Sequence, residues 1–96
     1  MHRVLLERRL RDVHARLVQA RQELAVLDEQ LAVVRESADE ARVRALVSET
    51  PLATHEHNEA ERYADVMTRA REALCQTVQD LERRQDELLA AVGSGP

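Results

Sequence analysis

One feature limits the possible folds of this chain more than any other: it has almost no residues that end helices. Between Met1 and Val92 the only glycine or proline is Pro51. These two residue types are the strongest local interruptions of regular structure, and a β-sandwich or barrel needs turn residues every ~8–12 positions. The chain therefore predicts two long helices, at about residues 2–48 and at about 51–92.

Both halves of the chain carry apolar side chains at the a and d positions of a heptad repeat labelled abcdefg, which we call the seam. With Leu10 at a, the first half keeps this pattern through six consecutive heptads, and about three or four already indicate a coiled coil. Arg71 and Gln85 interrupt the seam of the second half. The seam positions are Arg3, Leu6, Leu10, Val13, Leu17, Ala20, Leu24, Leu27, Leu31, Val34, Ala38, Ala41, Ala45 and Ser48, then Ala53, His57, Ala60, Ala64, Met67, Arg71, Leu74, Val78, Leu81, Gln85, Leu88 and Val92.

These two helices predict an all-α fold, a two-helix antiparallel coiled-coil hairpin, because a short connection places consecutive helices side by side. We expect one domain over residues 1–92, a connection at about 48–55 and a mobile tail at 93–96. The second helix has two possible starts. It begins at Pro51 if Thr50 is its N-cap, or at residue 55 if Thr54 caps it.

Two alignments of the helices remain open at this stage. A three-residue turn centred on Glu49 sets Leu17 opposite Leu81. A slip of one heptad lengthens the connection to about eight residues, sets Leu17 opposite Leu88 and brings Arg21 near Glu82. We favour the short turn, because apolar layers outweigh exposed ion pairs, which contribute about 0–1 kcal/mol each.

The first helix is also apolar at b and c positions, on the side opposite its seam. The same positions of the second helix are mostly acidic or amide side chains. A helix that is apolar on two opposite sides is buried between two neighbours, and a hairpin supplies only one. We therefore predict a homodimer or homo-oligomer, a four-helix bundle in which the first helix uses Val4, Leu5, Val18, Ala25, Val26, Ala32, Val33, Leu46 and Val47 as its interface.

Charge and composition exclude several classes of protein. The net charge of −4 argues against a nucleic-acid partner, which favours a basic surface. No run of 18 apolar residues is present, so we expect no membrane span, and the start of the chain is too briefly apolar for a signal peptide. Cys75 is the single cysteine and rules out an intrachain disulfide. We expect a cytoplasmic location.

The one dense group of reactive side chains begins the second helix. The His55–Glu59 and His57–Glu61 pairs are each spaced i,i+4, so each pair could supply two metal ligands. Two ligands do not make a site, and an acidic first turn also stabilises a helix N-terminus. We therefore expect no metal and no cofactor, with His55, His57, Glu59 and Glu61 as the candidates. No nucleophile–base pair or phosphate loop is present, so we expect no enzyme.

The run Arg44-Ala45-Leu46-Val47-Ser48-Glu49-Thr50-Pro51-Leu52-Ala53 resembles short coiled-coil hairpin proteins of high-GC actinobacteria. This resemblance implies a helical hairpin and no known activity. In outline, a hairpin with an acidic tip also resembles the coiled-coil fingers of transcription factors that enter the secondary channel of RNA polymerase. In those factors, tip carboxylates reach the catalytic metal. The corresponding acids here are Glu49, Glu56 and Glu59.

We therefore predict a non-enzymatic protein–protein interaction or scaffold module. It self-associates through the first helix and presents the end of the hairpin to a protein partner. Loops on rigid scaffolds often carry recognition. The alternative is a regulatory factor that inserts an acidic tip into a larger machine such as RNA polymerase. The tip residues are Glu49, Thr50, Pro51, Leu52, His55 and Glu56.

Overall fold

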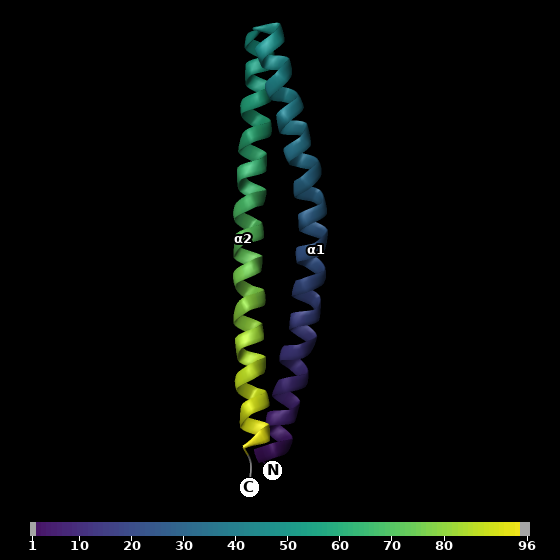
Figure 1. Cartoon of the computed structure of the whole chain (residues 1–96), viewed down its shortest axis with the longest axis vertical. Helices are drawn as coiled ribbons and strands as arrows, with labels where there is room; N and C mark the ends of the chain where they lie inside the picture. Colours follow the sequence, from purple (N-terminus) through teal and green to yellow (C-terminus); the bar gives the residue numbers. More distant parts are fainter. Residues whose placement is uncertain (1, 95–96) are drawn as a thin grey trace. The chain divides into compact units, whose positions relative to one another are not determined.

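The computed structural model describes residues 2–94 and confirms the all-α helical hairpin. Helix α1 (His2–Ser48) has 47 residues and helix α2 (Pro51–Gly93) has 43. They are the only regular elements of the described residues, and Glu49 and Thr50 alone separate them. Figure 1 shows α1 and α2 meeting at this connection. The structure thus has the shorter of the two connections considered, and α2 begins at Pro51.

The hairpin forms two compact units, described here one at a time. The terminal unit contains Met1–Leu24 and Ala73–Pro96, and the tip unit contains Ala25–Glu72. In each unit a segment of α1 lies beside a segment of α2 (Figure 1).

Burial follows the seam in both units. Every buried residue among those described is at an a or d position, and each remaining seam residue except Arg3 and Ser48 is half-buried. No polar or charged residue among those described is buried. The heptad pattern therefore predicted which side of each helix is covered.

Large aliphatic side chains fill the core of the terminal unit. Leu17 has no exposed surface and packs with Ala20 and Val78. Leu24, Leu74 and Leu81 lie against this cluster. The cluster combines Leu17 with Leu81 and does not include Leu88, which agrees with the short connection.

Smaller side chains fill the seam of the tip unit. Leu31 is almost fully buried, but its buried neighbours toward the connection are alanines and one methionine. Small residues let two helices approach closely but remove less apolar surface from water, at about 25 cal/mol per Å². The buried residues of this unit are Leu31, Ala38, Ala41, Ala53, Ala64 and Met67.

Two polar residues of the α2 seam, Arg71 and Gln85, are each paired with a side chain of α1 in their own unit. In the tip unit, the Arg71 guanidinium donates a hydrogen bond to the Asp28 carboxylate and forms an ion pair with it. In the terminal unit, the amide nitrogen of Gln85 lies 3.2 Å from Nδ1 of His14. Polar seam residues of this kind lower stability but help to fix helix alignment.

Backbone capping at the connection explains why it is so short. The Glu49 N–H donates to the Ala45 carbonyl at 3.1 Å, and Glu49 adopts a left-handed backbone with φ of 53°. This is the αL cap that ends many helices, usually at glycine. The Thr50 Oγ1 then accepts the Ala53 N–H at 3.2 Å. Thr50 is therefore the N-cap of α2, and Pro51 occupies its first position, where a missing N–H costs nothing.

The C-terminal end of α2 differs from the sequence expectation. Gly93, expected to open a mobile tail, belongs to α2. The Ser94 N–H donates to the Ala90 carbonyl at 3.0 Å, so the helical hydrogen-bond pattern continues past the glycine. Gly95 and Pro96, the rest of the expected tail, lie outside the described residues.

Candidate functional site

The side of α1 opposite the seam is apolar and uncovered. Its seven Val and Leu residues are 39 to 79% exposed, and the two alanines at equivalent positions are also exposed. Single exposed aliphatics are ordinary on a protein surface, but these recur at the same heptad positions of one helix. The outer strip, as we call it, consists of the expected interface residues Val4, Leu5, Val18, Ala25, Val26, Ala32, Val33, Leu46 and Val47.

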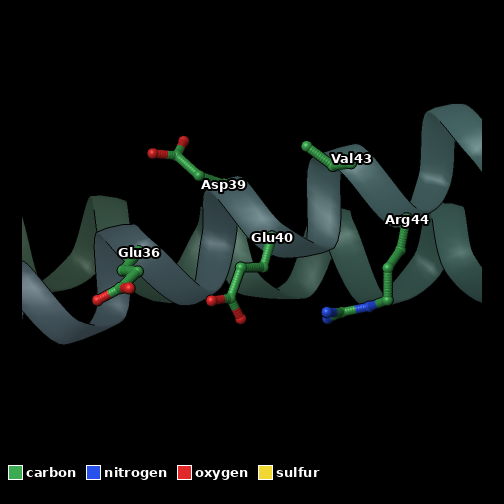
Figure 2. Close-up of a pocket in the computed structure, with 5 residues that line it drawn as sticks. All are labelled: Glu36, Asp39, Glu40, Val43 and Arg44. Atoms are coloured by element: carbon green, nitrogen blue, oxygen red, sulfur yellow. The ribbon is translucent and has the colours of Figure 1, made fainter.

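Two charged heptads interrupt the outer strip. Arg11 and Asp12 occupy b and c near the start of α1, and Asp39 and Glu40 occupy them toward its end. Around the second interruption lies a surface pocket of about 480 Å³ (Figure 2). A single helix lines it, with Glu36, Asp39, Glu40, Val43 and Arg44.

The pocket is a depression on the helix surface and not a cleft between helices. Figure 2 shows Glu40 and Arg44 projecting on the same side of α1, with Asp39 and Val43 on the other. Such a surface exposes charges and one apolar side chain. It offers no enclosed volume in which a small substrate could be held.

The outer side of α2 differs in composition. At its b and c positions Leu52, in the first turn, and Val66 are the large aliphatic side chains, and most of the others are polar residues such as Asp65 and Gln79. Apolar side chains therefore gather on one side of α2, whereas those of α1 are divided between two opposite sides. Of the two helices, α1 is therefore the one that exposes a recurring apolar side opposite its seam.

The six tip residues are all exposed, so the end of the hairpin is accessible. Leu52 is exposed among them and has the exposed Leu46 and Val47 on the adjoining end of α1. The tip therefore carries aliphatic surface as well as the Glu49 and Glu56 carboxylates.

The candidate metal ligands are not brought together. No group of three or more His, Cys, Asp or Glu side chains within residues 2–94 is arranged to hold a metal ion. His57 is half-buried at a seam position, with its Nδ1 3.9 Å from the Glu61 Oε1 and without a hydrogen bond. Glu59 forms an ion pair with Arg62 at 2.8 Å, and His55 is exposed.

One member of the exposed apolar surface was missed by the sequence reasoning. Val43 is half exposed and lies at an f position. In a helix the f position lies between b and c, so Val43 lies on the same side of α1 as the outer strip, between Val33 and Leu46. Counting f positions together with b and c would have found it.

Comparisons of the chain with protein-family models, curated proteins and solved structures give no match. Neither α1 nor α2, over the part of the chain that the structure describes, has an apolar stretch able to cross a bilayer. The expected likeness to actinobacterial hairpin proteins stays a prediction.

Proposed function

We propose that this chain is a non-enzymatic coiled-coil scaffold of the cytoplasm that self-associates through the outer strip of α1 and presents its tip to a protein partner. The observation that carries the proposal is the exposure of the seven Val and Leu side chains of the strip, set against the polar outer side of α2. The lone thiol of Cys75 suits a reducing compartment.

The energy of covering the strip supports self-association. Burying one Val or Leu side chain contributes about 1.5–3 kcal/mol. Covering the strip thus yields on the order of 10 kcal/mol per chain before the cost of association. A contiguous apolar surface of this kind is typical of an interaction site. A two-helix chain also has little core of its own, which makes association more valuable for its stability.

A four-helix bundle with α2 outermost is the arrangement that covers the strip. In it, α1 lies between α2 of its own chain and α1 of a second copy. Two-fold symmetry closes such an assembly, since each copy offers the same surface to the other.

The tip supports the second half of the proposal. Its six residues are exposed and stand on a connection whose backbone is fixed by the Glu49 and Thr50 caps. Recognition segments held by rigid elements are common in binding proteins. A mixed aliphatic and acidic tip fits a protein surface that offers an apolar recess with a basic margin.

Separate substitutions test self-association through the outer strip and partner binding through the tip. Val33→Asp places a charge within the strip and is expected to abolish assembly in sedimentation velocity, whereas Glu49→Ala and Glu56→Ala leave assembly intact. An affinity pull-down from the native host is expected to lose its partner with the tip variants. Assembly that survives Val33→Asp would contradict the strip as the interface. Partner capture unaffected by both tip changes and by Leu52→Ala would contradict the tip.

A further inference from the structure

The arrangement of charges along the outer strip points to the orientation and alignment of the second copy, an inference that rests on the proposed self-association. We propose that two α1 helices pack antiparallel, with residue i of one copy opposite residue 51 − i of the other. The two-fold axis then passes between Ala25 and Val26.

This alignment sets every Val and Leu of the strip opposite another apolar strip residue, while Ala32 lies opposite Gln19. The two charged heptads lie equally far from residues 25 and 26 along α1, and so do the two apolar ends. In an antiparallel pair, each charged heptad therefore faces the other charged heptad, and each apolar end faces the other apolar end. Val18 lies opposite Val33, and Ala25 lies opposite Val26. At the ends of the helix, Val4 meets Val47 and Leu5 meets Leu46.

Charges in the same alignment are balanced. Arg11 of one copy lies opposite Glu40 of the other, whereas Asp12 lies opposite Asp39. Each pair occurs twice by symmetry, so favourable and unfavourable pairs are equal in number. At the f positions no like charges meet: Gln22 opposes Glu29, Ala15 opposes Glu36 and Arg8 opposes Val43. The Arg8–Val43 pair is the one place in this alignment where a large aliphatic side chain of the outer side faces a charge.

A parallel copy in the same place is much less favourable. Symmetry then sets every residue opposite itself, so each charge of the outer side meets a like charge. Five of these are carboxylates, and like charges facing one another across an interface disfavour pairing. The seven charged residues that would meet their own copies are Arg8, Arg11, Asp12, Glu29, Glu36, Asp39 and Glu40.

Antiparallel alignments displaced by one heptad are also disfavoured. A displacement in one direction sets Val33 opposite Arg11 and Leu5 opposite Asp39. Displacement in the other direction sets Val18 opposite Glu40. An apolar side chain facing a charge leaves that charge partly desolvated without a partner. Staggered parallel packing does not close into a dimer, since the two copies would use different surfaces.

Disulfide cross-linking distinguishes these alignments, with Cys75→Ala as the background so that introduced thiols are the only ones. Val18→Cys and Val33→Cys change exposed positions, and circular dichroism verifies that each variant keeps its helix content. The antiparallel alignment predicts that neither variant cross-links to itself, while an equal mixture of the two forms a mixed disulfide dimer.

Charge reversal gives a second, independent readout. Arg11→Glu or Glu40→Arg alone is expected to raise the dimer dissociation constant about tenfold, since each changes two opposed pairs. The double variant is expected to restore the original value, because each reversed charge again meets its opposite across the two-fold axis.

The outcomes separate the alignment from self-association itself. A mixed disulfide together with rescue by the double charge reversal supports the antiparallel alignment. Efficient disulfide formation between two copies of the Val18→Cys variant, in a protein that still sediments as a dimer, would overturn the alignment. It would not contradict the proposed self-association. A monomeric mass of the unmodified chain would overturn both.

Discussion

The outer sides of α1 and α2 occupy equivalent heptad positions of one hairpin, yet they have opposite character. On α1 these positions carry Val26 and Val33, whereas on α2 they carry residues such as Asp65 and Gln79. Since the folding of the hairpin covers neither side, its own stability does not require the difference. The difference supports the proposal that the apolar residues of α1 outside the seam are covered by a second molecule.

The largest expected difference in stability is between substitutions at two neighbouring residues on opposite sides of α1. Leu17→Ala empties a site with no exposed surface and is expected to lower the free energy of unfolding by about 3 kcal/mol. Val18→Ala, one residue further on, is expected to cost about 1 kcal/mol or less.

Urea unfolding at one protein concentration measures both changes, because the stability of an oligomer depends on concentration. Equal losses for the two variants would mean that the outer strip is as tightly packed as the seam. A loss below about 1 kcal/mol for Leu17→Ala would contradict the seam itself.

The next effect compares the two outer sides directly. Val26 of α1 and Val66 of α2 are 52% and 56% exposed, and are therefore a matched pair. Val26→Asp is expected to weaken self-association about 100-fold or more, because a charge must be buried without a partner. Val66→Asp is expected to leave it within about threefold. Sedimentation equilibrium measures both, and equal effects would contradict the assignment of the interface to α1.

A smaller effect contrasts the seam with the outer side of α2. Gln85→Leu completes the apolar seam of the terminal unit and is expected to raise the free energy of unfolding by about 1 kcal/mol. Gln79→Leu adds the same side chain at an exposed b position of α2 and is expected to change stability by less than about 0.5 kcal/mol. Thermal or urea unfolding distinguishes them, and a gain from Gln79→Leu alone would show that α2 has a second neighbour.

The smallest effect lies at the connection. Glu49 has a positive φ, which glycine adopts without steric cost. Glu49→Gly is therefore expected to stabilise the hairpin by about 0.5–1 kcal/mol. Glu56→Gly, within α2, is expected to destabilise it by about 1 kcal/mol. If Glu49→Gly destabilises as well, the carboxylate of Glu49 has a stabilising role that its backbone geometry does not reveal.

The sequence predicted the seam because helix periodicity and burial are directly linked. Leu17 and Leu31 lie 14 residues apart on α1, and Met67 and Leu88 lie 21 residues apart on α2; all four are buried, and both spacings are multiples of seven. The N-cap at Thr50 was also predictable, since a threonine before proline is a recognisable helix start.

Other features depend on geometry that composition does not specify. A left-handed cap is usually a glycine, and here Glu49 occupies it, so the short connection was predicted but its left-handed backbone could not be read from the residue type. A guanidinium nitrogen of Arg21 lies 3.7 Å from the Oε1 of Glu82, although the heptad alignment predicted this pair only for the longer connection. Both side chains are long enough to bridge an offset of several residues, so their pairing does not identify helix alignment.

The candidate site was predictable in part. The exposure of the b and c residues of α1 follows from their place opposite the seam. The separation of the His and Glu side chains at the start of α2 could not be predicted from heptad positions alone, because Glu59 pairs with Arg62 at 2.8 Å and His57 faces the seam. Which molecule covers the strip is a property of two chains and is not contained in the fold of one.

Sedimentation equilibrium of the unmodified chain at micromolar concentration is the most direct test of the central claim, that a second copy covers the outer strip. The account predicts a particle of twice the 10.9 kDa mass of the chain, or a larger whole multiple. A single species of 10.9 kDa throughout that concentration range would contradict it.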